Sequence, residues 1–351
     1  MTAILGRLDK ANQAVALREY LETAAKQGYT IPTQHLGLGG QGEFVTADVS
    51  SAPPRQVTAG KLFKAVRAFS LPVSVLPVFL ATAAVLRPSQ WRWDVLICAA
   101  VGAGLLHCAG NLLNDYFDFL SKVDRRTRDD DFRPGRLLVY RLLLPRDVMI
   151  EAIVCLAAVA AISGYLIWRC GPGLIGFALA AAAALYAYTG PPFRLKYHAL
   201  GEAVIFVTFG PLLMLGAAWV QTGRLELTAL LLSLPVGLAT TAILVGNNFR
   251  DRQEDGQAGI KTIGHFAGGN VARFTYLAAV ISSTLAVAAI AAAGRGPWPL
   301  IFAPLTLVLL AKPLRFILKG QRLPDIDAQT ARFETILLLG VLATYVVAGS
   351  L

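Results

Sequence analysis

Two clusters of acidic and amide side chains follow apolar stretches at widely separated places in the chain. The first lies in the segment NLLNDYFD and the second in the segment NNFRDRQEDGQAGIKT. On a helix, the i, i+3, i+4, i+7 spacing of the first cluster and the i, i+4, i+8 spacing within the second would each place these side chains on one face. The members are Asn111, Asn114, Asp115 and Asp118 in the first cluster, and Asn247, Asn248, Asp251 and Asp255 in the second.

Carboxylate and amide oxygens of this kind are suited to Mg²⁺. Proteins usually hold Mg²⁺ through a few such groups, with phosphate oxygens and water completing its coordination. Two oxygen-rich faces at two helix ends therefore predict a pair of Mg²⁺ ions that hold a diphosphate. Basic residues close to the clusters in the sequence would help to bind the same anion, and they are Lys122, Arg133, Lys196, Arg250 and Lys261.

Membrane-spanning helices are the elements that must position these clusters. Of the 351 residues, 55% are hydrophobic and 15% are charged, which is typical of an integral membrane protein. The apolar runs approach the roughly 20 residues that a helical span needs, and they lack the short alternation of a β-barrel. The sequence predicts an all-α fold of nine transmembrane helices, at about residues 68–86, 93–113, 148–168, 172–189, 200–221, 227–247, 271–294, 297–312 and 333–350.

Basic residues are distributed unevenly between the two ends of these spans. Five of the 32 Lys and Arg fall on one side, and the others fall on the side of the N-terminus. By the positive-inside rule, the N-terminus and both polar clusters face the cytoplasm. The net charge of +10 is then a signal of topology, and nucleic acid is not an expected partner. The five are Arg87, Arg92, Arg169, Arg224 and Arg295.

The first 60 residues differ in composition from the rest and are expected to form a cytoplasmic accessory segment ahead of a membrane domain at 61–351. Residues 8–27 carry apolar side chains at mostly helical spacing, which predicts a short amphipathic helix. Residues 28–60 are rich in Gly, Pro, Ser and Thr, which indicates an irregular linker. Because the whole segment is polar, no cleavable signal peptide is expected.

Catalysis, ion transport and simple helix capping are the readings open for the two clusters. Capping explains one or two polar residues at a helix end, whereas each cluster holds four. A transporter places its ion site near the membrane midplane, whereas all these carboxylates are predicted at one membrane face. Catalysis on a diphosphate is therefore favoured, with a cation-coupled transporter as the alternative.

Three segments resemble the signature motifs of the UbiA superfamily of intramembrane prenyltransferases. They are NLLNDYFD with Asp124 after it, YTGPPFRLKYHALGE, and NNFRDRQEDGQAGIKT. The forms NxxNDYxD and NNxRDxxxDxxxGxxT most resemble the branch that prenylates 1,4-dihydroxy-2-naphthoate in menaquinone biosynthesis. The similarity covers about residues 62–350. It implies nine transmembrane helices around a central cavity that opens laterally to lipid, with two Mg²⁺ ions between the acidic motifs.

The resemblance also assigns roles to residues by position. It implies that Asn111, Asp115, Asp118, Asp251 and Asp255 hold metal. It further implies that the diphosphate is held by Asn114, Lys122, Lys196, Asn247, Asn248, Arg250 and Lys261, with Arg133 placed to join them. We expect His107, one turn before Asn111, to line the cavity, and the aromatic side chains of Tyr116, Tyr186 and Tyr188 to stabilise a cation.

The implied reaction transfers a polyprenyl group from a prenyl diphosphate to an aromatic acceptor that is a quinone precursor, at the cytoplasmic membrane and among its lipids. Two features depart from the naphthoate branch: no glycine precedes Asp124 in FLSKVDRRTRDDD, and the N-terminal segment is atypical. Some members of the superfamily with similar metal motifs cyclise the prenyl diphosphate instead. A membrane terpene cyclase is therefore the alternative enzyme.

Overall fold

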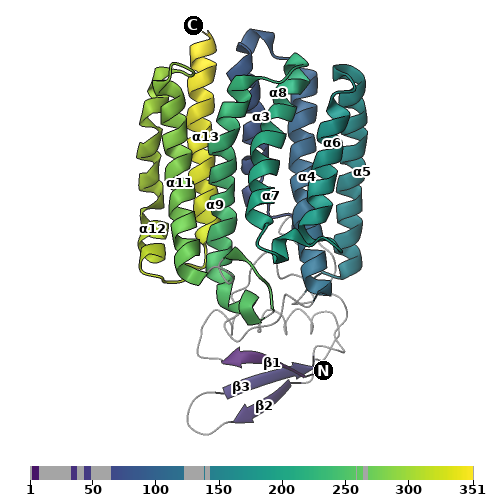
Figure 1. The fold of residues 1–351 in the computed structure, drawn as a ribbon. Helices are drawn as coiled ribbons and strands as arrows, with labels where there is room; N and C mark the ends of the chain where they lie inside the picture. Colours follow the sequence, from purple (N-terminus) through teal and green to yellow (C-terminus); the bar gives the residue numbers. More distant parts are fainter. Residues whose placement is uncertain are drawn as a thin grey trace.

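Long apolar helices stand side by side in the part of the chain that follows the N-terminal segment (Figure 1). The computed structural model describes residues 2–7, 33–37, 43–48, 65–121, 138, 143–257, 259–263 and 268–350. Within these residues, eight helical segments are long and apolar enough to cross a membrane, and α6 (Leu174–Thr189) is apolar but shorter. All nine spans expected from the sequence are present, so the predicted all-α membrane bundle is confirmed.

The bundle begins with the short helix η2 (Ala68–Ser70) and α3 (Pro72–Val85), followed by α4 (Trp93–Leu120) and α5 (Pro145–Cys170). After α6, one interrupted span consists of α7 (Gly201–Val207), the π-helical turn η6 (Thr208–Leu212) and α8 (Leu213–Thr222). The chain then forms α9 (Leu227–Gln257), α11 (Gly268–Ala292), η7 (Trp298–Leu310) with α12 (Ala311–Leu318), and α13 (Ile326–Ser350).

Both polar clusters are carried by helices that continue past their apolar runs. Helix α4 extends to Leu120 and α9 extends to Gln257, beyond the expected span ends at residues 113 and 247. Neither extension contains a proline that would break the helix. The two helices run in the same direction, so their polar ends lie together at the lower end of the bundle (Figure 1).

The interrupted span of α7, η6 and α8 is held in place by close packing against α9. A Cβ atom added at Gly210 would lie 2.6 Å from the Ser233 carbonyl oxygen, and one added at Gly237 would lie 2.8 Å from the Phe206 carbonyl oxygen. Only glycine permits such an approach, which is the small-residue contact common between membrane helices. The turn η6 is thereby held against α9.

Three strands in the N-terminal segment correct one prediction. Strands β1 (Thr2–Arg7), β2 (Thr33–Gly37) and β3 (Glu43–Asp48) pair antiparallel in the order β1-β3-β2. The irregular linker expected at 28–60 is therefore wrong for β2 and β3. Their sequences, TQHLG and EFVTAD, contain Thr, Val and Phe on either side of a glycine-rich stretch, which is a hairpin pattern. The helix expected at 8–27 lies outside the described residues.

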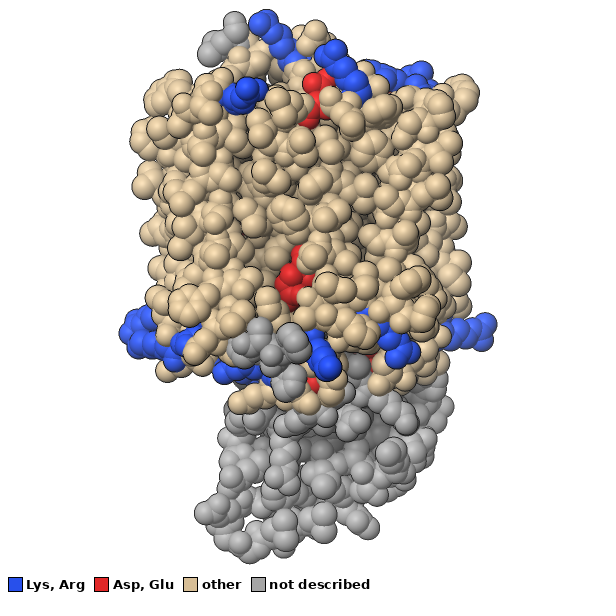
Figure 2. All heavy atoms as spheres, viewed as in Figure 1, with Lys and Arg blue, Asp and Glu red and all other residues tan. Residues whose placement is uncertain are grey.

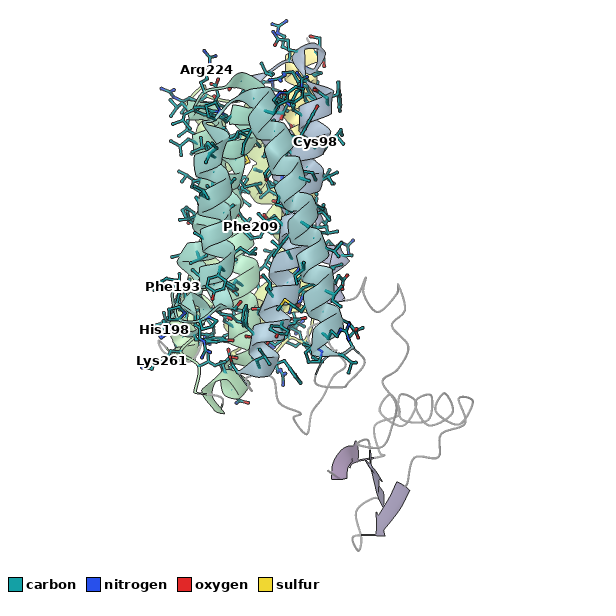
Figure 3. All side chains as sticks on the ribbon, turned by 90° about the vertical axis from the view of Figure 1, so that its right-hand side faces the viewer. Cys98, Phe193, His198, Phe209, Arg224 and Lys261 are labelled. Atoms are coloured by element: carbon teal, nitrogen blue, oxygen red, sulfur yellow. The ribbon has the colours of Figure 1, made fainter. Side chains whose placement is uncertain are left out.

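The surface of the bundle agrees with a membrane location. Figure 2 shows a broad belt of mostly uncharged side chains, with acidic side chains visible in its lower half, between an upper and a lower band of Lys and Arg. In Figure 3, Arg224 lies at the upper end and Lys261 at the lower end. Five of the expected spans come before Arg224. Because five is an odd number, Arg224 was expected on the side opposite to the N-terminus, and its place at the upper end agrees with this expectation. The protein is an integral membrane protein.

Candidate active site

The two polar clusters line the same cavity, which has a volume of about 810 Å³. All eight cluster residues from α4 and α9 contribute to the wall at one end. Toward the other end the wall is largely apolar and includes Leu166, Leu174 and Val220. Lining residues on α4 extend from Asp118 back to Ala99, a span of about 29 Å at the rise of an α-helix. A long apolar chain with a charged head group matches this shape.

Asp115, which is buried, is paired with an arginine that the sequence analysis did not single out. Arg67 Nη2 lies 2.5 Å from Asp115 Oδ1. The backbone of Arg67 is left-handed, with φ of 54°, a strained conformation for a residue other than glycine and one that often occurs at functional sites. Asn111 holds the same segment, because its Nδ2 donates to the Val66 carbonyl at 3.0 Å. In the sequence, Arg67 looks like a topology signal ahead of the first span.

Asp118 is paired with Lys196 from the loop between α6 and α7. Lys196 Nζ lies 2.7 Å from Asp118 Oδ2 and donates to Asn114 Oδ1 at 2.9 Å. The Tyr197 hydroxyl, also missed in the sequence, donates to Asp118 Oδ1. Burial lowers the pKa of Lys196, but Asp118, Tyr188 and Tyr197 together raise it by more, so the pKa ends above its usual value. Lys196 therefore remains a cation inside the cavity.

Arg250 organises the second cluster. Its Nε and Nη2 each lie 2.8 Å from one carboxylate oxygen of Asp251, and its Nη2 also donates to Asn247 Oδ1. Nη1 donates to the Pro324 carbonyl and pairs with Asp327 Oδ1, both at 3.0 Å. Pro324 and Asp327 also line the cavity. The start of α13 is thus a third part of the site. This contribution was not expected from the sequence, because the segment before α13 is mainly basic.

The pKa of Asp255 is affected by charged residues near both polar clusters. Burial raises the pKa of Asp255 to about 7, Lys196 lowers it, and the charges of Asp251 and Asp118 raise it. The Thr262 hydroxyl donates to Asp255 Oδ2 at 3.1 Å and favours the ionised form. Asp118 of the first cluster and Asp251 of the second both raise the pKa of this carboxyl, and both line the cavity. The polar faces of α4 and α9 therefore face each other across the cavity.

Asn248 connects the second cluster to α7. Its Nδ2 donates to Glu202 Oε1 at 2.7 Å. This bond gives Glu202, a carboxylate near the start of a membrane span, a partner that lessens the cost of its burial. Asn248 itself still contributes to the cavity wall.

The aromatic and imidazole side chains expected in the cavity divide into two groups. His107 and Tyr188 line the cavity, whereas Tyr116 and Tyr186 do not, contrary to expectation. Tyr116 packs in a hydrophobic cluster formed with α5, and Tyr186 is 47% exposed and donates to the Pro191 carbonyl at 2.6 Å. Successive helical residues point about 100° apart, so Tyr116, one position after Asp115, and Tyr186, two positions before Tyr188, face elsewhere.

The predicted cations also divide. Lys196 and Arg250 line the cavity. Lys261 does not; its side chain is exposed, and its backbone donates to the Tyr197 carbonyl at 3.3 Å and pairs with His198. Figure 3 shows His198 and Lys261 together at the lower end of the bundle. Lys122, Asp124 and Arg133 lie outside the described residues.

The oxygen donors suit Mg²⁺ chemically, although their present contacts are with cations. Among the described residues, no three His, Cys, Asp or Glu side chains are close enough to hold a metal ion as they stand. Asp115, Asp118 and Asp251 are each engaged by an Arg or Lys side chain. Carboxylate and amide oxygens are nevertheless the ligands that Mg²⁺ prefers. Metal binding would exchange these cations for the ion and leave them available to an anion.

Comparison with known proteins gives a consistent picture. A family model described as the UbiA prenyltransferase family matches residues 74–346. UbiA prenyltransferase domain-containing protein 1 from Rattus norvegicus is 36% identical over 217 residues, which cover 60% of this chain and 62% of that protein. Its homologue from Drosophila melanogaster is 32% identical over 256 residues, covering 67% and 66%. The chain thus spans about two thirds or less of the length of these relatives.

Solved structures share the fold at low sequence identity. A UbiA homologue from Archaeoglobus fulgidus bound to GPP and Mg²⁺ has a TM-score of 0.59 and 14% identity, and the match covers 82% of this chain and 99% of that one. The apo structure of a UbiA homologue from Aeropyrum pernix K1 has a TM-score of 0.57 and 18% identity, with coverage of 84% and 100%.

Proposed function

Because the chain belongs to the UbiA prenyltransferase family, we propose that it transfers a polyprenyl group from a prenyl diphosphate to an aromatic acceptor. The acceptor that we propose is 1,4-dihydroxy-2-naphthoate or a related quinone precursor, which would place the protein in menaquinone biosynthesis. One observation carries this proposal: carboxylates and cations from both polar clusters gather at one end of a long, otherwise apolar cavity. A diphosphate at the polar end and a prenyl chain along the apolar wall would fit it.

The oxygen-rich residues would hold two Mg²⁺ ions. We assign this role to Asn111, Asp115, Asp118, Asp251 and Asp255, all of which line the cavity. Bound Mg²⁺ supplies Lewis-acid stabilisation of the charge that develops on a leaving diphosphate. The amide groups of Asn114, Asn247 and Asn248 lie among these carboxylates and would complete the polar surface around the phosphates.

The cations would hold the phosphate oxygens directly. Lys196 and Arg250 line the cavity, and Arg67 joins them from the segment before α3. Their ion pairs with carboxylates keep them in place before substrate arrives. A guanidinium fork suits two phosphate oxygens at once, whereas the Lys196 ammonium acts as a compact charge. Loss of the diphosphate from the donor would be aided by these charges.

The apolar wall would protect the allylic cation that remains. Water is excluded by side chains such as Leu166 and Val220, and the ring of Tyr188 faces the cavity, where an aromatic face can stabilise positive charge. An electron-rich ring carbon of the acceptor then forms the new carbon–carbon bond. For 1,4-dihydroxy-2-naphthoate, the carboxylate at that carbon leaves as carbon dioxide and its bonding electrons restore the ring.

We also propose that the protein lies in the cytoplasmic (inner) membrane, with the polar end of the cavity facing the cytoplasm. The sidedness of Lys and Arg in the sequence supports this orientation. Prenyl diphosphates and the acceptor would then enter from the cytoplasm or from the surrounding lipid.

An assay of the purified protein separates the possible activities. Radiolabelled geranylgeranyl diphosphate is incubated with protein and Mg²⁺, with and without 1,4-dihydroxy-2-naphthoate, and both diphosphate and labelled products are followed. Release of diphosphate that requires the acceptor, with label in a prenylated naphthol, supports the proposal. Release of diphosphate without acceptor, with a cyclic hydrocarbon as product, would identify a terpene cyclase. Absence of release under both conditions would leave cation transport as the function to test.

A further inference from the structure

A polar cluster lies deeper in the cavity than the carboxylates, on a wall that is otherwise largely apolar. His107 is on α4, eight residues before Asp115, and is therefore about 12 Å away along the helix axis. Its Nε2 lies 3.1 Å from Ser70 Oγ, and its Nδ1 is hydrogen-bonded to Ser74 Oγ. All three of these side chains contribute to the cavity wall. We call His107, Ser70 and Ser74 the deep polar cluster.

The hydrogen bonds of this cluster determine where its protons lie. Ser70 Oγ donates its only proton to the Arg67 carbonyl at 2.8 Å, so it must accept a hydrogen bond from His107 Nε2–H. A neutral imidazole then has an acceptor at Nδ1, and Ser74 Oγ–H must donate to it. Ser74 Oγ is left with lone pairs and has no second hydrogen-bond partner among the described residues. Ser74 lines the cavity with 2% of its surface exposed, so a donor placed directly against the cavity wall can reach this acceptor.

Binding of a prenyl chain does not explain the deep polar cluster. Burial of an imidazole and two hydroxyls in a membrane span is unfavourable unless they are hydrogen-bonded, and a prenyl chain has no polar atoms to contact them. Thr208 and Thr240 also line the cavity, but each donates its hydroxyl proton to a carbonyl of its own helix or to Glu334. The deep polar cluster instead joins two helices and presents an acceptor.

An aromatic ring packs against the imidazole of the deep polar cluster. Phe209 lies in η6 and lines the cavity, and its ring meets the His107 ring edge to face, with centroids 5.3 Å apart and planes at 81°. In Figure 3, Phe209 lies at mid-height within the bundle. A π-helical turn is uncommon and often occurs at functional sites. The turn places an aromatic surface beside the His107 ring, whose Nδ1 is hydrogen-bonded to Ser74 Oγ.

We propose that the deep polar cluster and Phe209 form the binding subsite for a ring hydroxyl of the aromatic acceptor. Ser74 Oγ accepts a hydrogen bond from the O–H of a phenol or hydroquinone, His107 positions Ser74 by accepting its proton, and Phe209 packs against the ring. This inference rests on the proposed function and adds the residues that bind a hydroxyl of the acceptor. The hydrogen bond leaves more electron density on the ring carbon that attacks the prenyl cation.

A comparison of three substrates in the wild-type protein and two variants tests the assignment. The probes are 1,4-dihydroxy-2-naphthoate and its 1- and 4-monomethyl ethers, which lack one O–H donor each, and kcat/KM is measured for every pair of probe and protein. The wild-type protein should disfavour one of the ethers by about tenfold, the effect of one hydrogen bond. In Ser74→Ala the preference should fall toward unity, and in Ser74→Thr, which keeps the hydroxyl, it should persist.

A matched control and a second readout make the outcomes separable. Ser163 lines the cavity on α5, and Ser163→Ala should keep the wild-type preference. Calorimetric binding of the same probes needs no turnover, so an inactive protein still reports on Ser74. An unchanged preference in Ser74→Ala, by rate and by binding, overturns the inference. A wild-type protein that binds the naphthoate through Ser74 but transfers no prenyl group overturns the proposed function and leaves the subsite in place.

Discussion

Lys196 Nζ lies 2.7 Å from Asp118 Oδ2, although the two residues are 78 positions apart in the sequence. The pair connects the polar end of α4 to the loop before α7, and Asp255 of α9 lies within the electrostatic reach of both. Equivalent pairs join Arg67 to Asp115 and Arg250 to the neighbouring carboxylate on α9. Asp115, Asp118 and Asp251, three of the five proposed metal ligands, are thus each paired with a cation that could move to a phosphate oxygen.

The carboxylates should be essential for catalysis while contributing little to folding. Asp118→Asn and Asp251→Asn should each lower kcat/KM for prenyl transfer by about 100-fold or more, because charge stabilisation of the leaving group is lost. Thermal unfolding in detergent should change little. The matched control is Asp325→Asn: Asp325 lines the cavity, but its carboxylate accepts from Gln329 at 2.7 Å. Near-normal rates in either cluster variant would remove that residue from the metal site.

Lys196 and Arg250 should determine how tightly the donor binds. In Lys196→Gln and Arg250→Gln, the KM for geranyl diphosphate should rise by about 10-fold or more, since each loses a charged hydrogen bond to phosphate. Lys261→Gln is the control, because that side chain is exposed and outside the cavity. A rise in KM for Lys261→Gln equal to that of Lys196→Gln would instead place Lys261 on the diphosphate.

Asp327 should act by positioning Arg250. Its carboxylate pairs with Nη1, on the opposite side of the guanidinium from the atoms that bind Asp251. If a metal ion draws Asp251 away, Asp327 and the Pro324 carbonyl still hold Arg250 toward the cavity. Asp327→Asn should therefore raise the KM for geranyl diphosphate by a few-fold, roughly the effect of one weakened ion pair, with kcat less affected. A fall in kcat at unchanged KM would contradict this role.

Affinity for Mg²⁺ should depend on pH through Asp255. Burial raises the pKa of this carboxyl to about 7, so below that pH it is protonated and a metal ion must displace the proton. Calorimetric affinity should increase from pH 6 to pH 8 and then level off. Thr262 lowers this pKa by its hydrogen bond, and Thr262→Val should move the rise to higher pH. An affinity that is constant across this range would exclude Asp255 as a ligand.

The sequence was sufficient for the spans and for the two polar faces, because both depend on periodicity along one helix. Contacts between elements were harder. Arg67 and Asp327 join the site from segments whose basic residues suggested only topology, and Tyr197 follows Lys196 without any pattern of its own. Tyr116 was expected to stabilise a cation because it is aromatic and belongs to the first motif, but a rotation of about 100° from Asp115 turns its side chain away from the cavity.

The N-terminal segment shows a different limit. Its glycine-rich composition suggested a linker, but strands pair through the backbone, and two of them flank the glycines. The hairpin pattern of these two segments was the available signal, but their short length leaves little alternation to support it. For the site, the corresponding limit is that the sequence does not show which side chains form ion pairs. No local rule connects Asp118 to Lys196, which lies in a loop far away in the sequence.

The number of divalent ions bound with a diphosphate is the most direct test of a site shared by α4 and α9. Binding of Mn²⁺, as a spectroscopic substitute for Mg²⁺, is measured by electron paramagnetic resonance in the presence of a non-reactive thio analogue of geranyl diphosphate. The wild-type protein should bind two ions that depend on the analogue, and Asp115→Asn and Asp251→Asn should each reduce this number. Two ions that persist in both variants, or no ions that depend on the analogue, would contradict the shared site.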